Sequence, residues 1–129
     1  MSLQFKYALR KGFEFHAAHS LKGAVPENHK CYKMHGHTYK GEVVLYSYDL
    51  DNHMVVDAGL IKKIIEPLDH ANLDEVLGIP PTAENIARWI AEQILAVIFR
   101  MQLETVVRLD YVQLYETDGM CVTLRLEEV

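Results

Sequence analysis

The strongest constraint on the fold is the segment His37 to Tyr48, whose side chains alternate between two faces without interruption. One face carries His37, Tyr39, Gly41, Val43, Leu45 and Ser47, and the other carries Thr38, Lys40, Glu42, Val44, Tyr46 and Tyr48. A period of two over this length predicts a long β-strand. A lone strand is unstable in water, so the rest of the chain must supply a sheet.

Other segments predict the partners of this strand. Strand composition marks residues 4–15, 105–115 and 120–126, with a tight turn at Asp118-Gly119 before the last of them. Two amphipathic helices lie between the second and third strands. The first has Asp57 as its N-cap and Pro67 as its terminator, and the second is capped by Thr82. The element order is ββααββ, which predicts an α+β fold.

Length and charge define the class of protein. The chain has 129 residues, is 50% hydrophobic and carries a formal net charge of -5. This predicts one domain over residues 1–129 with a sizeable core and excludes a disordered chain. No stretch approaches the ~20 apolar residues that span a bilayer, and no signal-peptide pattern or basic run is present. We therefore expect a cytoplasmic protein whose partners are neither nucleic acid nor membrane.

Cysteine and histidine usage points to a chemical site. Two cysteines, Cys31 and Cys121, are too few for a disulfide framework, and we expect Cys121 to be buried in the last strand. Five of the seven histidines fall between His16 and His37. His35 and His37 are two apart in a strand, so both imidazoles point to one face and can reach one metal ion.

His19, at the end of the preceding strand, would complete a set of three histidines. Three nitrogen ligands with an open fourth position are typical of catalytic zinc. The alternative is a pair of partly exposed strand histidines with no ligand.

Three further positions have side chains suited to acid–base chemistry or substrate binding. Cys31 lies in a polar loop four residues before His35, where a thiolate can serve as general base. The adjacent Asp69 and His70 form a carboxylate–imidazole pair that can handle a proton. Glu116, at a strand end, can accept two parallel N–H bonds from an amino-heterocycle. Each position also has a structural alternative. Cys31 would be an inert thiol, Asp69 and His70 would cap a helix end, and Glu116 would be an ordinary solvated glutamate.

Five motifs together resemble the 6-pyruvoyl-tetrahydropterin synthase family. They are Phe15-His16-Ala17-Ala18-His19, Cys31-x-x-x-His35-Gly36-His37, Leu68-Asp69-His70, Pro81-Thr82-Ala83-Glu84-Asn85 and Tyr115-Glu116-Thr117. They occur in the family's order from the first strand to the last. The three residues between the cysteine and His-Gly-His are most similar to the 6-carboxy-5,6,7,8-tetrahydropterin synthases of the queuosine pathway.

The resemblance implies a fold and an assembly. The fold is the tunnelling fold, a four-stranded antiparallel sheet with two helices between its second and third strands. In this family the sheets of three subunits close into a barrel, and two trimers stack as a hexamer, which removes exposed sheet edges. The active sites then lie between subunits of the homo-oligomer.

The resemblance also implies the site and the reaction. A Zn²⁺ ion would be bound by His19, His35 and His37. Cys31 would be the general base, with Asp69 and His70 as its proton-handling partners. The pterin would be held by Glu116, Thr82 and Ala83. The implied reaction converts 7,8-dihydroneopterin triphosphate to 6-carboxy-5,6,7,8-tetrahydropterin, acetaldehyde and triphosphate.

Other functions remain open at this point. One is triphosphate elimination of the 6-pyruvoyl-tetrahydropterin synthase type, and another is a different activity on dihydroneopterin. A non-enzymatic zinc-binding oligomer is less favoured, because Cys31, Asp69, His70 and Glu116 occur together. A cupin-type barrel is disfavoured because two helices interrupt only four strands.

Overall fold

Two long antiparallel strands form the centre of the structure, a computed structural model that describes residues 1–129. Strands β1 (Tyr7–His19) and β2 (His35–Ser47) pair without a register shift, from Tyr7 opposite Ser47 to His19 opposite His35. Strand β1 therefore extends beyond the predicted end at residue 15, because β2 continues to pair with it. This extension places His19 inside the sheet.

Three more strands complete one sheet in the order β3-β1-β2-β4-β5. Strands β4 (Val107–Thr117) and β5 (Met120–Arg125) are antiparallel neighbours joined by the predicted turn at residues 118–119. The four antiparallel strands confirm the predicted sheet. The additional strand β3 (Ala71–Asn72) is only two residues long and runs parallel to the end of β1.

The two predicted helices are α1 (Gly59–Ile65) and α3 (Ala83–Arg100), and α1 continues into the 3-10 helix η1 (Glu66–Leu68). A short helix α2 (Leu73–Leu77) was not predicted. The Thr82 hydroxyl caps α3 by accepting a hydrogen bond from the Asn85 amide at 3.1 Å, as expected. The prediction that Asp57 is the N-cap of α1 is wrong by one residue, because the cap is Ala58, which makes no side-chain bond. The Asp57 carboxylate instead accepts a hydrogen bond from the Gly59 amide at 2.9 Å.

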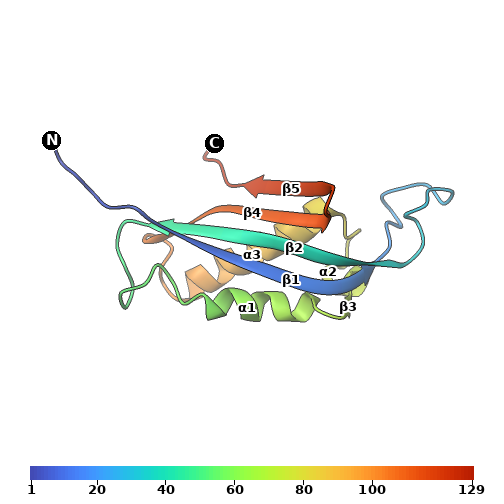
Figure 1. The fold of residues 1–129 in the computed structure, drawn as a ribbon, viewed down its shortest axis with the longest axis horizontal. Coiled ribbons are helices and arrows are strands. Elements are labelled where there is room, and N and C mark those ends of the chain that lie inside the picture. The colour runs from blue at the N-terminus through green and yellow to red at the C-terminus, as the bar shows by residue number, and fades with distance from the viewer.

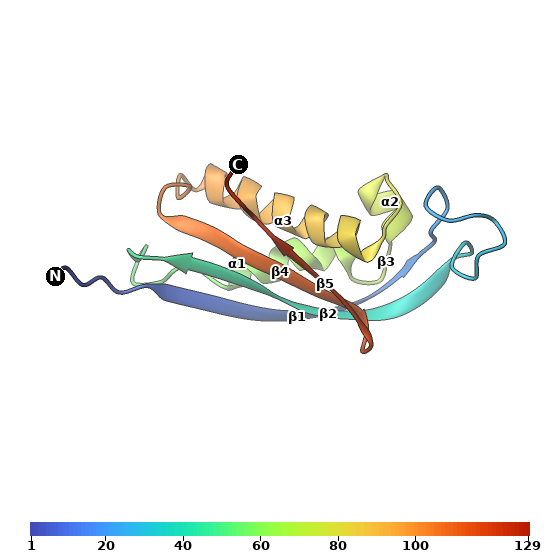
Figure 2. The same cartoon turned by 90° about the horizontal axis from the view of Figure 1, so that it is seen from above.

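All helices lie on one face of the sheet, and the other face is bare (Figure 2). The core lies between the layers, where Phe15, Tyr39 and Val43 of the sheet are buried together with Ile86, Ile90 and Ile94 of α3. Both chain termini lie at one end of the sheet, and the loop of residues 20–34 lies at the other (Figure 1). The chain is an α+β protein.

The prediction that Cys121 is buried is wrong, because Cys121 is exposed. Cys121 pairs with Tyr115 in the register of β4 and β5. Its strand neighbours Val122 and Leu124 pack against the core, so the alternation of β5 directs Cys121 to the bare face. None of the helices is both long enough and apolar enough to cross a membrane.

Candidate active site

Three histidine side chains meet on the helix-covered face, at the end of the sheet next to the loop of residues 20–34. The β1–β2 register sets this arrangement, because His19 lies opposite His35, and His37 is two residues further along β2. One ring nitrogen from each of the three lies within 4.8 Å of the others. His19 is fully buried, whereas His35 and His37 are half-buried.

Backbone carbonyls determine the tautomers of two of these rings. His19 Nδ1 lies 2.7 Å from the Pro81 carbonyl oxygen, and His35 Nδ1 lies 2.8 Å from the Lys33 carbonyl oxygen. A carbonyl only accepts, so each Nδ1 must carry the hydrogen. In the neutral rings each Nε2 is then an unprotonated lone pair. These two Nε2 atoms face each other at 3.0 Å, an arrangement that requires a cation or a proton to bridge them.

The third ring, that of His37, is neutral at pH 7, as a metal ligand must be. Burial lowers the pKa of His37, the Glu116 carboxylate partly offsets this, and the His19 and His35 rings lower it further. The imidazole is therefore neutral at pH 7. Its Nε2 atom is buried without a hydrogen bond and lies 3.3 Å from Glu116 Oε1.

The donor set fits a metal ion. Nitrogen ligands at about 2.05 Å from a tetrahedral ion are about 3.3 Å apart, close to the 3.0 Å between His19 Nε2 and His35 Nε2. Each carbonyl that holds an Nδ1–H fixes the ring orientation, which is a recurrent feature of metal-bound histidine. The structure therefore contains a set of three imidazoles able to hold one ion.

Tyr39 lies against the histidine cluster on the core side. Its ring centroid is 5.6 Å from that of His37 and 5.9 Å from that of His19, both in edge-on geometry. Tyr39 is fully buried and its hydroxyl has no hydrogen-bond partner. Burial raises the pKa of this hydroxyl, and the carboxylates of Glu116 and Asp74 raise it further, so it stays protonated.

The Asp69–His70 pair lies beside β1 at His16. Asp69 Oδ1 accepts a hydrogen bond from the His16 amide at 3.0 Å, and Asp69 Oδ2 lies 3.1 Å from His70 Nδ1. The His16 amide bond is the main reason that the pKa of Asp69 is lowered, with a further contribution from His70. His16 points to the bare face because it alternates with the buried Ala17 and His19.

His70 has a backbone φ of 57°, in the left-handed region that a non-glycine residue adopts only at a cost. Such conformations concentrate at functional sites, where the surrounding structure holds them in place. Here the His70 amide donates to the His16 carbonyl at 2.5 Å, which helps to fix the strained backbone. The His70 side chain remains 79% exposed and free to meet another molecule.

Cys31 lies in the loop of residues 20–34 and is half-buried. Its amide donates to His29 Nδ1 at 3.0 Å, and its carbonyl accepts from the Leu21 amide at 3.0 Å. These bonds hold the backbone and leave the thiol without an assigned partner. No hydrogen bond joins Cys31 to Asp69 or His70 within the chain.

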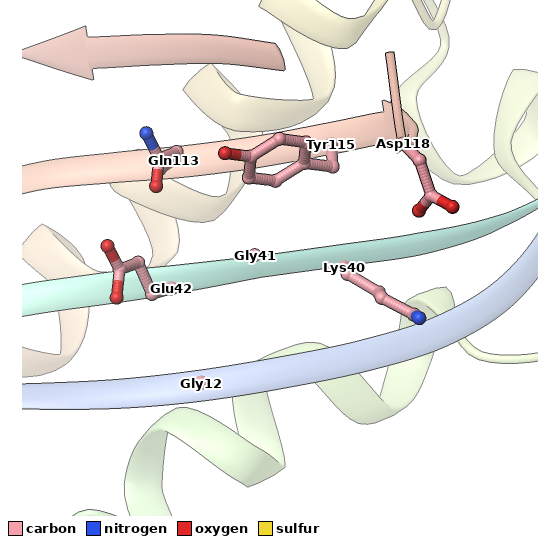
Figure 3. A pocket seen from close by; sticks show the side chains of 7 residues that line it. All are labelled: Gly12, Lys40, Gly41, Glu42, Gln113, Tyr115 and Asp118. Atoms are coloured by element: carbon pink, nitrogen blue, oxygen red, sulfur yellow. The ribbon is translucent and has the colours of Figure 1, made fainter. Parts of the chain in front are cut away.

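The bare face has its own pocket (Figure 3). Its lining comes from β1, β2, β4 and the turn that follows β4: Gly12, Lys40, Gly41, Glu42, Gln113, Tyr115 and Asp118. None of the predicted site residues lines it. The candidate chemistry therefore belongs to the histidine end of the sheet.

Residues 8–127 match the family described as 6-pyruvoyl tetrahydropterin synthase. The chain belongs to the 6-pyruvoyl tetrahydropterin synthase family. The resemblance inferred from the five sequence motifs is thereby confirmed, and so is the fold. A structure of the 6-pyruvoyl tetrahydropterin synthase of Caenorhabditis elegans superposes with a TM-score of 0.76 at 25% identity, covering 98% of this chain and 100% of that one.

Two relatives within the family carry different names. A "6-carboxy-5,6,7,8-tetrahydropterin synthase" of Synechocystis is 36% identical over 96 residues, which cover 65% of this chain and 71% of the relative. A "Dihydroneopterin monophosphate aldolase" of Pyrococcus furiosus is 35% identical over 114 residues, which cover 85% of this chain and 90% of the relative. Both names describe enzymes of pterin chemistry.

Within one chain, only some of the predicted site residues lie close to one another. His19, His35, His37 and Glu116 form one cluster, whereas Asp69 and His70 lie beside the outward-facing His16. Thr82 and Ala83 begin α3, where Ala83 is buried in the core. The roles assigned to these residues from the resemblance, including that of Cys31, stay predictions.

Sequence reasoning missed several groups that support the cluster. Tyr39 could have been found, because it follows His35 and His37 at the same period of two. The carbonyls of Lys33 and Pro81 could not be predicted as partners of the histidines, because backbone groups are the same at every residue type. Asp74 was also missed, because its partner is 54 residues away in the sequence. It accepts a hydrogen bond from the Ser20 amide at 2.8 Å and so fixes the backbone directly after His19.

Proposed function

We propose that the protein is a zinc-dependent lyase that converts 7,8-dihydroneopterin triphosphate and water to 6-carboxy-5,6,7,8-tetrahydropterin, acetaldehyde and triphosphate, as in queuosine biosynthesis. The observation that carries the proposal is the 3.0 Å approach of the Nε2 atoms of His19 and His35, whose Nδ1 atoms both face carbonyl oxygens. One ring nitrogen of His37 lies within 4.8 Å of both rings. The cluster offers three imidazole nitrogens and no cysteine, which favours a catalytic over a structural zinc site. The name of the Synechocystis relative supports the substrate and product.

The three histidines would hold the zinc ion. When bound, zinc supplies a Lewis acid that polarises a substrate oxygen and stabilises negative charge on it. The carbonyls of Pro81 and Lys33 keep the rings of His19 and His35 in the ligating tautomer. The desolvation of His37 keeps its ring neutral and available at pH 7.

Glu116 would hold the pterin ring. Its side chain is only 12% exposed and lies next to His37, so a ring bound by this carboxylate would lie beside the zinc ligands. A carboxylate can accept two parallel N–H bonds from the amino-pyrimidine edge. Thr82 and the backbone of Ala83 would assist at the start of α3.

Cys31 would remove a proton from the hydroxyl-bearing side chain of the substrate. Its proposed partners, Asp69 and His70, lie beside the outward-facing His16, so we propose that they come from a neighbouring copy of the chain. This requires the family's assembly, a hexamer formed by two trimers with sheets joined into barrels. The exposed His70 ring, oriented by Asp69, is suited to such a contact.

A second candidate is aldol cleavage of dihydroneopterin monophosphate. The specific observation in its favour is the Pyrococcus furiosus relative, whose match covers more of this chain than that of the Synechocystis protein. The same residues would serve this reaction, because it also begins with deprotonation of the substrate side chain. Elimination of the 6-pyruvoyl type is a third outcome to be tested, supported by the Caenorhabditis elegans structure.

Mass spectrometry of the products would distinguish the three reactions. The zinc-loaded protein is incubated separately with the triphosphate and the monophosphate of 7,8-dihydroneopterin. Carboxytetrahydropterin and acetaldehyde from the triphosphate would support the lyase. A pyruvoyl product, or cleavage of the monophosphate alone, would refute it in favour of the corresponding alternative.

Two pairs of variants test the residue roles. Cys31→Ala should abolish turnover, whereas Cys121→Ala, which changes the exposed second cysteine, should not. His35→Ala should lose bound zinc by metal analysis, whereas His53→Ala, at an exposed turn, should retain it. Full turnover by Cys31→Ala would exclude the thiol as base, and zinc retained by His35→Ala would exclude the ligand set.

A further inference from the structure

We propose that Asn85 is a positioning residue for the metal site, because it fixes the backbone whose carbonyl orients His19. This inference rests on the proposed metal-binding function of the three histidines. It assigns to Asn85 a role different from starting helix α3, which Thr82 already caps.

The contacts form a continuous path from Asn85 to His19. The Asn85 side-chain Nδ2 donates to the Pro80 carbonyl at 2.8 Å, and the Thr82 amide donates to the same oxygen at 2.9 Å. The next carbonyl along the chain, that of Pro81, accepts from His19 Nδ1 at 2.7 Å. His19 belongs to β1, so this last bond joins the start of α3 to the sheet.

The two prolines make the path rigid. The Pro80 carbonyl belongs to the planar peptide unit between Pro80 and Pro81, so the two donors that hold the oxygen hold the whole unit. The ring of Pro81 fixes its φ. The direction of the Pro81 carbonyl then depends only on the ψ angle of Pro81. That angle is restricted because the next residue, Thr82, caps α3. The direction of the acceptor offered to His19 is therefore set before any ion binds.

The orientation of His19 matters because the ring is fully buried and is one of two whose Nε2 atoms converge. A ring released from the Pro81 carbonyl could flip or change tautomer, and Nε2 would no longer be a lone pair directed at His35. Loss of an outer hydrogen-bond partner of a metal-bound histidine typically lowers metal affinity by 10-fold to 100-fold. Asn85 acts one step further out, so we expect a loss of about 10-fold.

The variant Asn85→Asp separates positioning from helix stability. Aspartate has nearly the same shape but presents an oxygen where Asn85 presents its donor, so the bond to the Pro80 carbonyl is lost. An acidic side chain in the first turn of a helix is favourable, so α3 itself is not weakened. Zinc affinity, measured by competition with a chromophoric chelator, should fall about 10-fold. The thermal midpoint of the metal-free protein should fall by only a few degrees, because one hydrogen bond of about 1 kcal/mol is lost while the protein stays folded.

A matched control and a second readout complete the test. Asn72→Asp makes the same change at the start of α2, where the side chain acts only as an acceptor for the Asp74 amide, and it should retain wild-type affinity. In the metal-free protein, the His19 Nδ1–H proton should exchange with solvent faster in Asn85→Asp than in wild type by NMR.

Two results would overturn the inference, and they are distinguishable. If wild type binds zinc and Asn85→Asp binds it within twofold, with unchanged exchange at His19, the positioning role is refuted while the metal site stands. If wild type itself binds no zinc, the proposed function fails and the inference fails with it.

Discussion

Replacing Gly41 with alanine should destabilise the protein strongly, because a Cβ atom there has no room. It would lie 2.1 Å from the Gln113 carbonyl oxygen on β4 and 2.6 Å from the Phe13 ring on β1. The ring can rotate, but the carbonyl belongs to the neighbouring strand. Relief therefore requires β2 and β4 to separate by about 1 Å, against a normal strand spacing of about 4.8 Å.

Two contributions make up the expected loss in the free energy of unfolding. One or two ladder hydrogen bonds at about 1 kcal/mol each would be weakened, and overpacking adds about 1–3 kcal/mol. We expect a total of about 3–4 kcal/mol, a large fraction of the 5–15 kcal/mol typical of a domain. With a urea slope of about 2 kcal/mol/M, the unfolding midpoint should fall by about 1.5–2 M.

Gly12 provides the control, because it lines the same pocket of the bare face (Figure 3). A Cβ at Gly12 would meet only the Gly41 carbonyl at 3.7 Å, an ordinary contact. Gly12→Ala should therefore leave the midpoint unchanged or raise it, since alanine suits a strand interior better than glycine by roughly 0.5–1 kcal/mol. A Gly41→Ala midpoint within about 0.5 M of wild type would refute the reasoning from the close approach.

Three other perturbations have expected outcomes. Tyr39→Phe should raise the free energy of unfolding by about 1 kcal/mol in urea melts, because it removes a buried hydroxyl without a partner; a loss of stability would show that the hydroxyl is bonded. The folded-state pKa of Asp69 is lowered, so its stabilising effect is present above the unfolded pKa of 3.8 and disappears as pH falls through the folded value. Asp69→Asn should thus be less stable than wild type at pH 7 but not at pH 2, and a pH-independent difference would contradict this. Zinc at 100 times its Kd should raise the thermal midpoint by about 10 °C, reversibly with a chelator, and an unchanged midpoint would argue against the metal site.

Local patterns in the sequence were enough for the main elements and for part of the candidate site. The alternation through β2 predicted that His35 and His37 share a face, and a threonine before an apolar stripe predicted the cap of α3. Both signals depend on residues within a few positions of each other, so the backbone geometry of one element suffices to interpret them. The same limitation explains why α2 and β3 were missed, since each is too short to show a period.

Contacts between distant segments could not be predicted from local patterns, because they depend on how the whole chain packs. The register that sets His19 opposite His35, the Pro81 carbonyl that orients His19, and the location of Asp69 beside the outward-facing His16 each join parts of the chain that have no shared local pattern. Burial likewise depended on packing, which exposed Cys121 and left the Tyr39 hydroxyl without a partner. Residue type and strand period are local properties, so they were enough to show which side chains are available for chemistry. Their distances, tautomers and partners followed from the pairing of strands and the packing of α3 against the sheet, because these depend on the chain as a whole.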